Sequence, residues 1–317
     1  MSVTPTPAAR SNRTSLHRLT KASLLASQPR KRDVEPPSKD NPIIISASEL
    51  RDWLRCRVMH HWRHQVKLSP SGGVPNLAIG SLVHNILESW YGLEPKRRTV
   101  KRMHAISDAT LAKTNWRELT KADLELIRAM CNGYAAWAKV GDKEIGLLEC
   151  TPESWFEEPL TPDADVIVRG KIDNTFMPTT LKRTVACSEF KTAGQFKDNI
   201  VELNLQLSVY LWALRAKFPK MKRYIAHYTQ LRKQMPGPRV KADLFKRDSV
   251  EREPEQLDQW ARDARLTALD MHGAAVYPNP MDSCAWGCDF KVPCMLRGNP
   301  GDLKHVLTTQ YVPKTYR

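Results

Sequence analysis

No stretch of the chain approaches the roughly 18 consecutive apolar residues that a membrane-spanning helix requires. The most apolar helical run, residues 203–214, is interrupted by Asn204, Gln206 and Ser208. The first apolar run, residues 24–26, is far too short for the central part of a secretory signal peptide. The sequence therefore predicts no membrane span and no secretion signal, and we expect a protein of the cytoplasm.

A disulfide framework is also lacking, because the chain has seven cysteines, an odd number, and no secretion signal. Cys284, Cys288 and Cys294 fall within eleven residues as C-x3-C-x5-C, and such short loops let several thiolates converge on one metal centre. Four ligands are usual, and Cys56 is the candidate for the fourth. It lies 228 positions before Cys284, so the site would join two distant parts of the chain, and closing so long a loop removes much entropy from the unfolded chain. The other three cysteines are expected to be ordinary buried thiols: Cys131, Cys150 and Cys187.

Positive charge is in excess. The chain has 49 Lys and Arg against 34 Asp and Glu, a net charge of +15. This excess indicates a polyanionic partner, of which nucleic acid is the commonest, although a basic surface without a special partner remains an alternative. With 317 residues and 41% hydrophobic residues, the chain is long and apolar enough to fold around a substantial core.

The sequence divides into three parts. Residues 1–41 carry eight Lys and Arg against three Asp and Glu and are expected to form a disordered basic arm; an organelle-targeting segment is the less favoured alternative. Residues 42–298 are expected to form the folded domain, and residues 299–317 a polar C-terminal tail.

Periodicity predicts the elements of the folded domain. Ser46 and Glu49 fit a capping box that starts a helix ending near residue 67. The remaining predicted helices cover residues 78–91, 121–140, 200–217 and 255–272, and the predicted strands cover residues 153–159, 166–177, 184–191 and 223–231. This order predicts an α/β or α+β fold with a central sheet flanked by helices.

Asp173, Glu189 and Lys191 carry the strongest chemical signal. Side chains alternate between the two faces of a strand, so Glu189 and Lys191 point the same way and Phe190 points into the core. Asp173 lies on the preceding strand of a predicted hairpin, so both carboxylates can bind one Mg²⁺ or Mn²⁺. Such an ion polarises a phosphodiester and lowers the pKa of bound water, and Lys191 can stabilise the charge that develops. Taken alone, the three residues also fit a solvated salt-bridge face.

Three further features fit the same site. Gly170, three residues before Asp173, allows another backbone to approach closely. His84 can offer an imidazole to the metal ion, although a single helical histidine is more often structural. Gln206 and Tyr210 are four residues apart on one helical face, where they can hold a phosphate or form a plain polar stripe.

Together these motifs resemble the RecB-like branch of the PD-(D/E)XK nucleases. The resemblance rests on Gly80-x-x-x-His84, Gly170-x-x-Asp173, Glu189-x-Lys191 and Gln206-x-x-x-Tyr210, in this order within residues 43–297. It implies a restriction-endonuclease-like core with His84, Asp173 and Glu189 as metal ligands, Lys191 as the catalytic lysine, and Gln206 and Tyr210 as substrate-binding residues. Ile172-Asp173 replaces the Pro-Asp of the class name.

The cysteines resemble those of the iron–sulfur members of this branch, such as the AddB nuclease domain and the CRISPR-associated exonucleases, which place one cysteine before the nuclease motifs and three after them. The resemblance implies a [4Fe–4S] cluster on Cys56, Cys284, Cys288 and Cys294. The family's usual spacing is C-x2-C-x5-C, and Cys56 lacks the proline that often follows it. His60, His61 and His64 lie nearby, so a histidine ligand or a Zn²⁺ site stays open.

We therefore expect a metal-dependent exonuclease that prefers single-stranded DNA. The resemblance implies 5′→3′ cleavage and a role in DNA recombination, repair or replication, with recombination or replication proteins as partners. The compact length and the segment 277–280 look most like phage-encoded members, which would place the protein in the host cytoplasm. The alternatives are a non-catalytic, metal-stabilised nucleic-acid-binding protein and an endonuclease or nickase of the same fold.

Overall fold

The computed structural model describes residues 35–72, 75–113, 119–237 and 243–313. The basic arm expected over residues 1–41 lies mostly outside the described residues. The chain divides into two compact units. The sheet unit contains the described residues of 32–54 and 73–274, and the cysteine unit contains those of 55–72 and 275–317. None of the described helices combines the length and the apolar composition that crossing a bilayer requires.

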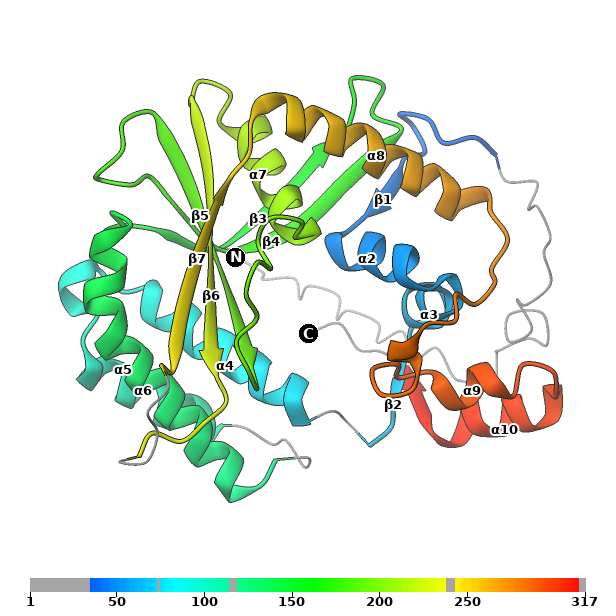
Figure 1. Cartoon of the computed structure of the whole chain (residues 1–317), viewed down its shortest axis with the longest axis horizontal. Coiled ribbons are helices and arrows are strands. Elements are labelled where there is room, and N and C mark those ends of the chain that lie inside the picture. Colours follow the sequence, from blue (N-terminus) through cyan, green and yellow to red (C-terminus); the bar gives the residue numbers. More distant parts are fainter. Residues whose placement is uncertain (1–34, 73–74, 114–118, 238–242, 314–317) are drawn as a thin grey trace, which may run out of the picture. The chain divides into compact units, whose positions relative to one another are not determined.

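The sheet unit is built on one mixed six-stranded sheet (Figure 1). Its strands run in the order β1-β4-β5-β6-β7, with β3 also paired to β4. The β1–β4 and β5–β6 pairs are parallel, and the other pairs are antiparallel. The strands are β1 (Ile43–Ile45), β3 (Thr151–Pro159), β4 (Val166–Phe176), β5 (Thr184–Ala193), β6 (Arg223–Arg232) and β7 (Phe245–Glu251).

Helices cover both faces of this sheet, as the expected α/β class requires (Figure 1). One core joins the sheet to α2 (Ala47–Arg55), α7 (Leu205–Lys217) and α8 (Pro254–Gly273). The other joins it to α4 (Pro75–Tyr91), α5 (Val100–Ala112) and α6 (Lys121–Glu144). On β5, Val185 and Cys187 enter the first core, and Ala186 and Phe190 enter the second. This alternation confirms that Phe190 points into the core.

Local capping sets where several helices begin. The backbone N–H of Ser46 donates to Glu49 Oε2 at 2.8 Å, and that of Glu49 donates to Ser46 Oγ at 3.3 Å, so the predicted capping box is confirmed. Helix α7 begins at Leu205, five residues later than predicted, because Asn204 caps it by accepting from the N–H of Leu207. Helix α5 and strand β7 were not predicted, since neither segment has strong apolar periodicity.

The cysteine unit is made from two segments that are far apart in the sequence. The first holds α3 (Arg57–His60), a π-helical turn (His61–Gln65) and β2 (Leu68–Pro70). The second holds a 3₁₀ turn (Asp282–Cys284), α9 (Lys291–Met295), α10 (Pro300–Thr309) and β8 (Tyr311–Pro313). Strands β2 and β8 pair antiparallel, and one apolar core contains residues of both segments.

Two expectations fail in the cysteine unit. The continuous helix predicted up to residue 67 is interrupted at Cys56, whose backbone is extended, with φ of −163°. The described part of the expected polar tail, residues 299–313, forms α10 and β8 instead. Leu303, Val306 and Leu307 bury one face of α10 in the core of the unit, so this short amphipathic segment is stabilised by packing rather than by composition.

Candidate metal centre

The site lies where the backbone pairing of two strands stops. Strands β4 and β5 pair only from Phe176–Ala186 to Asn174–Ser188, so the next opposed residues, Asp173 and Glu189, lie just beyond the last pair. Strand β3 occupies one edge of β4 over most of its length, so β1 and β5 must share the other edge. Because β1 pairs only with residues 166–168, residues 169–173 of β4 have no strand partner on that edge within the part of the chain that the structure describes.

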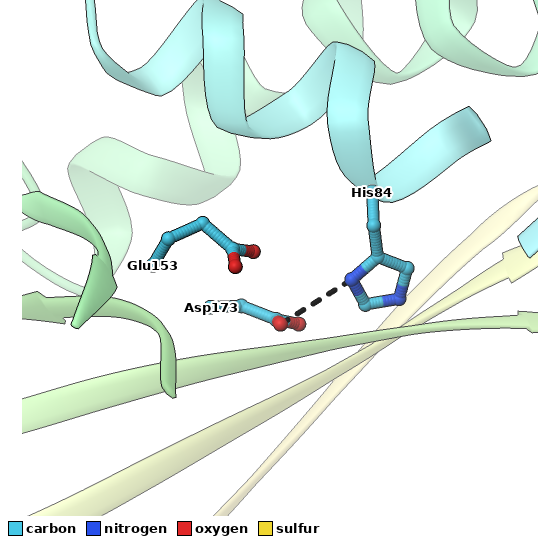
Figure 2. Close-up of side chains that lie close together, drawn as sticks. All are labelled: His84, Glu153 and Asp173. Carbon is cyan, nitrogen blue, oxygen red and sulfur yellow. Dashed lines mark ion pairs between the residues drawn. The ribbon is translucent and has the colours of Figure 1, made fainter. Parts of the chain in front are cut away.

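We call the place where β4 and β5 stop pairing, at Asp173 and Glu189, the fork. Side chains from helices on both faces of the sheet reach the carboxylates there. Asp173 Oδ2 accepts a hydrogen bond of 2.8 Å from the backbone N–H of Phe190, which fixes the carboxylate between the strands. From α4, His84 Nδ1 lies 3.3 Å from Asp173 Oδ1 (Figure 2). From α7, the amide of Gln206 donates to Glu189 Oε1 at 2.9 Å.

Three side chains converge as metal ligands do. One ligand atom from each of His84, Glu153 and Asp173 lies within 4.8 Å of the other two, and Figure 2 shows the side chains facing one another. His84 and Asp173 were both predicted to bind the metal ion. Glu153 was not, because its strand carries several acidic residues without a recognisable motif.

Glu153 occupies a strained position opposite Asp173. The pairs Pro152–Asn174 and Ser154–Ile172 flank the two residues, so the register places them directly across from each other. Glu153 has φ of +52°, which an L-residue adopts at a cost of about 1–3 kcal/mol. Its carboxylate forms an ion pair with the ammonium of Lys171. Strain of this kind is typical of functional positions.

Glu189 and Lys191 complete the site. Lys191 Nζ forms an ion pair with Glu189 Oε1. The other oxygen, Oε2, is buried without a hydrogen-bond partner among the described residues. Burial and the neighbouring charge of Asp173 raise the pKa of Glu189. Although burial alone would raise the pKa of Asp173 as well, the charges of His84 and Lys191 lower it below its ordinary value.

The pKa values of the two cationic groups, Lys191 and His84, are both raised. Burial would lower the pKa of Lys191 and of His84. For Lys191, the charges of Glu189 and Asp173 prevail and raise the pKa. For His84, the charge and hydrogen bond of Asp173 raise the pKa. The negative potential at the fork therefore favours cations. The two carboxylates are oxygen ligands of the kind that Mn²⁺ and Mg²⁺ take, and the imidazole adds a nitrogen ligand of the kind that transition metals take. The unpartnered Glu189 Oε2 fits the same ion.

Gln206 and Tyr210 line a cleft beside the centre and also contact protein groups. The Gln206 amide nitrogen also lies 2.6 Å from the hydroxyl of Tyr210. That hydroxyl donates to the backbone carbonyl of Lys171 at 2.9 Å, on the stretch of β4 that is paired on its β3 edge alone among the described strands. Gln206 and Tyr210 thus hold Glu189 and β4 in place, and the expected contact with a phosphate stays a prediction.

The close approach expected at Gly170 involves a side chain. A Cβ on Gly170 would lie 2.7 Å from the ring of Phe156, on the paired strand β3, and that ring packs edge-on against Tyr210 at 6.2 Å. The glycine therefore admits an aromatic ring that supports Tyr210, and not another backbone as expected.

A cleft of about 780 Å³ adjoins the centre. Four basic side chains are among its lining residues: Arg51, Arg169, Lys171 and Lys191. The same cleft is lined by Ser46 and Asn204, the residues that precede α2 and α7, and helix N-termini favour anions. The cleft therefore has the electrostatics of a binding site for phosphates.

The four predicted cluster ligands line one mainly apolar pocket of about 300 Å³ in the cysteine unit. Burial is the largest cause that raises the pKa of Cys288 and of Cys294, and the charges of the other cysteines add to it. No three of the sulfur atoms approach within 4.8 Å of one another, although all four cysteines belong to the described residues. His60, His61 and His64 are buried but do not line the pocket.

The remaining cysteines lie elsewhere. Cys131 and Cys187 are fully buried, and burial raises the pKa of both thiols. Cys150 is half-buried, and burial raises its pKa to about 11. None of the three lines the cysteine pocket, in line with ordinary structural thiols.

Comparison with known proteins agrees with this geometry. Residues 44–295 match the family described as the PD-(D/E)XK nuclease superfamily. The match takes in the fork, His84, Glu153 and all four pocket cysteines, and nearly the whole described chain. The chain therefore belongs to the PD-(D/E)XK nuclease superfamily. This membership supports a hydrolytic nuclease that acts on phosphodiester bonds.

Two solved structures are similar to this chain at low scores. A protein from Eubacterium rectale, provisionally assigned as an exonuclease, is 10% identical with a TM-score of 0.45; the match covers 89% of this chain and 94% of that one. A protein designated SSO0001 is 13% identical with a TM-score of 0.32, and the match covers 79% and 85%. At these scores neither likeness bears on activity. No curated protein matches the chain.

Proposed function

We propose that the protein is a metal-dependent deoxyribonuclease that degrades single-stranded DNA from an end. The single observation that carries the nuclease chemistry is the convergence of His84, Glu153 and Asp173 beside Glu189 and Lys191 at the fork in the sheet. A binding module has no need for two coupled buried carboxylates and a lysine, whose desolvation is costly unless a cation offsets it.

His84, Glu153, Asp173 and Glu189 would hold Mg²⁺ or Mn²⁺. Such an ion, when bound, polarises the scissile phosphate and lowers the pKa of a coordinated water. The pKa of Lys191 is raised, so its ammonium stays charged at neutral pH and can stabilise the negative charge that develops on the phosphate. The backbone N–H of Phe190 keeps the Asp173 carboxylate oriented, and Gln206 does the same for Glu189.

The activity is tested on end-labelled single strands, with Mn²⁺ and with Mg²⁺. Lys191→Met should abolish cleavage while binding in Ca²⁺ is retained. The matched control is Lys139→Met, which removes an exposed lysine on α6. Intact DNA with the wild-type protein under all metal conditions would overturn the proposal and favour a binding protein.

Strands blocked at the 5′ or the 3′ end report the direction of cleavage, for which we propose 5′→3′. A closed circular single strand that is cut would show an endonuclease.

We further propose that Cys56, Cys284, Cys288 and Cys294 bind a [4Fe–4S] cluster. All four line one mainly apolar pocket. The spacing of the cysteines along the chain, which resembles that of the iron–sulfur nucleases, supports a cluster, and Zn²⁺ is the alternative. Protein purified without oxygen should contain iron and sulfide in equal amounts. Colourless protein with stoichiometric zinc would contradict this.

The proposed biological setting is DNA recombination, repair or replication in the cytoplasm, with other recombination or replication proteins as partners. The phage-like features of the sequence support it, as does the net charge of +15. Pull-down with the intact chain from cells that degrade DNA ends would test the partners.

A further inference from the structure

Trp155 is an exposed indole beside the metal centre. It lies on β3, and 70% of its surface is exposed, whereas Trp53, Trp62 and Trp90 are each 2% exposed. A single exposed apolar residue is by itself normal, so only its surroundings can give it meaning. Those surroundings include the carboxylates at the fork.

Contacts of Lys171 fix the side of the sheet on which Trp155 lies. Trp155 and Lys171 are direct partners across β3 and β4, and the ammonium of Lys171 lies 5.8 Å from the centre of the indole ring. The same ammonium pairs with the carboxylate of Glu153, one of the three converging ligands. The indole, the cation and the metal ligands are therefore neighbours on one face.

Lys171 connects the indole to the basic cleft. It is the cross-strand partner of Trp155 and itself lines the cleft, although Trp155 does not. Its backbone carbonyl accepts a hydrogen bond from the hydroxyl of Tyr210, which fixes this part of β4. A phosphate bound in the cleft beside the Lys171 ammonium would therefore lie near the indole.

We propose that Trp155 and Lys171 form a subsite for one unpaired nucleotide, with the base stacked on the indole and its phosphate beside the ammonium. This inference rests on the proposed nuclease function and names its substrate class. Stacking of a base on an aromatic side chain contributes about 1–3 kcal/mol. Inside a duplex, both faces of a base are covered by its neighbours, so only an unpaired base or the last pair of an end can lie on the indole. The subsite therefore favours single strands, in which every base can be unstacked.

The experiment compares Trp155→Ala, Trp155→Leu and Trp155→Phe on a single strand and on the same sequence as a duplex. Loss of stacking should raise the KM for the single strand by roughly 5- to 150-fold in the Ala and Leu variants, with little change in kcat. The Phe variant should retain most of the affinity, because it keeps an aromatic face, whereas Leu keeps only apolar area. Duplex cleavage should change little.

A substrate variant tests the same contact from the other side. A single strand without bases near the cleaved end should bind wild-type protein as weakly as an intact strand binds Trp155→Ala. Leu266→Ala, which removes an exposed apolar residue on α8, is the matched control and should behave as wild type.

Binding measured by fluorescence anisotropy in Ca²⁺ separates this proposal from the proposed function. If the wild-type protein cleaves no DNA, and the Trp155 variants still bind single strands in the expected order of affinity, the nuclease proposal fails and the subsite stands. If the Ala and Leu variants bind and cleave single strands as wild type does, the subsite is overturned. A loss shared equally by duplex, or a raised Mn²⁺ requirement, also overturns it, because Trp155 would then support the metal centre. A change only in self-association would assign the indole to a protein interface and likewise overturn it.

Discussion

Glu153 and Asp173 face each other across β3 and β4. The backbone of Glu153 is strained, and its carboxylate lies close to His84 and Asp173. In a protein without a bound cation, two carboxylates so placed repel each other. Lys171 and His84 offset part of this repulsion, and a metal ion bound by both acids would offset it further. Glu153 is therefore the residue whose removal is most informative.

Glu153→Gln should raise the Mn²⁺ concentration for half-maximal activity by about 10- to 100-fold, the range seen when a group that supports a metal site is lost. Removing the ligand's charge weakens the bound cation, while the amide preserves the size of the side chain. Titration of activity with Mn²⁺ measures the change. Glu157→Gln, on an exposed position of the same strand, is the control. Equal metal requirements in both variants would exclude Glu153 as a ligand.

Gln206→Ala should lower activity by about 10-fold and also raise the Mn²⁺ requirement, because Glu189 Oε1 loses the amide that orients it. The free energy of unfolding should fall by about 1–3 kcal/mol, because the buried Glu189 Oε1 and the Tyr210 hydroxyl both lose the amide as a partner. Activity, metal titration and chemical denaturation give the three values. Gln259→Ala, at an exposed position of α8, should leave all three as in wild type. A variant that loses stability but keeps its metal requirement would show a purely structural role.

His227 should make the sheet unit sensitive to acid. It is buried and bonds Ser249 at 2.7 Å, and burial, together with the charge of Arg247, lowers its pKa to about 3. In the unfolded chain the imidazole titrates near 6.5. Between these two values the unfolded state binds a proton that the folded state does not, so the free energy of unfolding falls as the pH falls, by up to about 1.4 kcal/mol per pH unit.

Denaturation of wild type and His227→Asn between pH 7 and pH 4 measures this contribution. The variant should be less stable at pH 7, since it loses the stacking on Phe176, but its stability should decline less steeply with acid. Parallel curves for the two proteins would show that His227 does not control the acid response.

Cys294→Ala should reduce the yield of folded protein before it affects the chemistry. The four pocket cysteines come from both segments of the cysteine unit, so a bound cluster would cross-link residues that are 228 positions apart in the chain. Metal binding of this kind contributes directly to folding. Thermal melting, iron content and single-strand cleavage are compared with Cys150→Ala, which removes a thiol outside the pocket. A Cys294→Ala protein that melts as wild type does would count against the cross-link.

The sequence by itself determined the residues with distinctive chemistry. The helical and strand periods predicted most elements within a few residues, because amphipathic patterns report burial directly. The sequence predicted four site residues: Asp173, Glu189, Lys191 and His84. Few local patterns place such groups on neighbouring strands and a helix. The pocket cysteines were predicted from spacing, because thiolates that share a centre must lie on short loops or on segments that the fold joins.

Only the tertiary structure decided which groups complete the site. Glu153 has no motif of its own and becomes a candidate ligand only through the register of β3 on β4, which sequence periodicity does not fix. The roles of Gln206 and Tyr210 likewise depend on where β4 lacks a strand partner, a consequence of how β1 and β5 share its edge. Helix α10 was missed because its stability comes from the core that distant residues build around Leu303 and Leu307, and local propensity carries no record of such contacts.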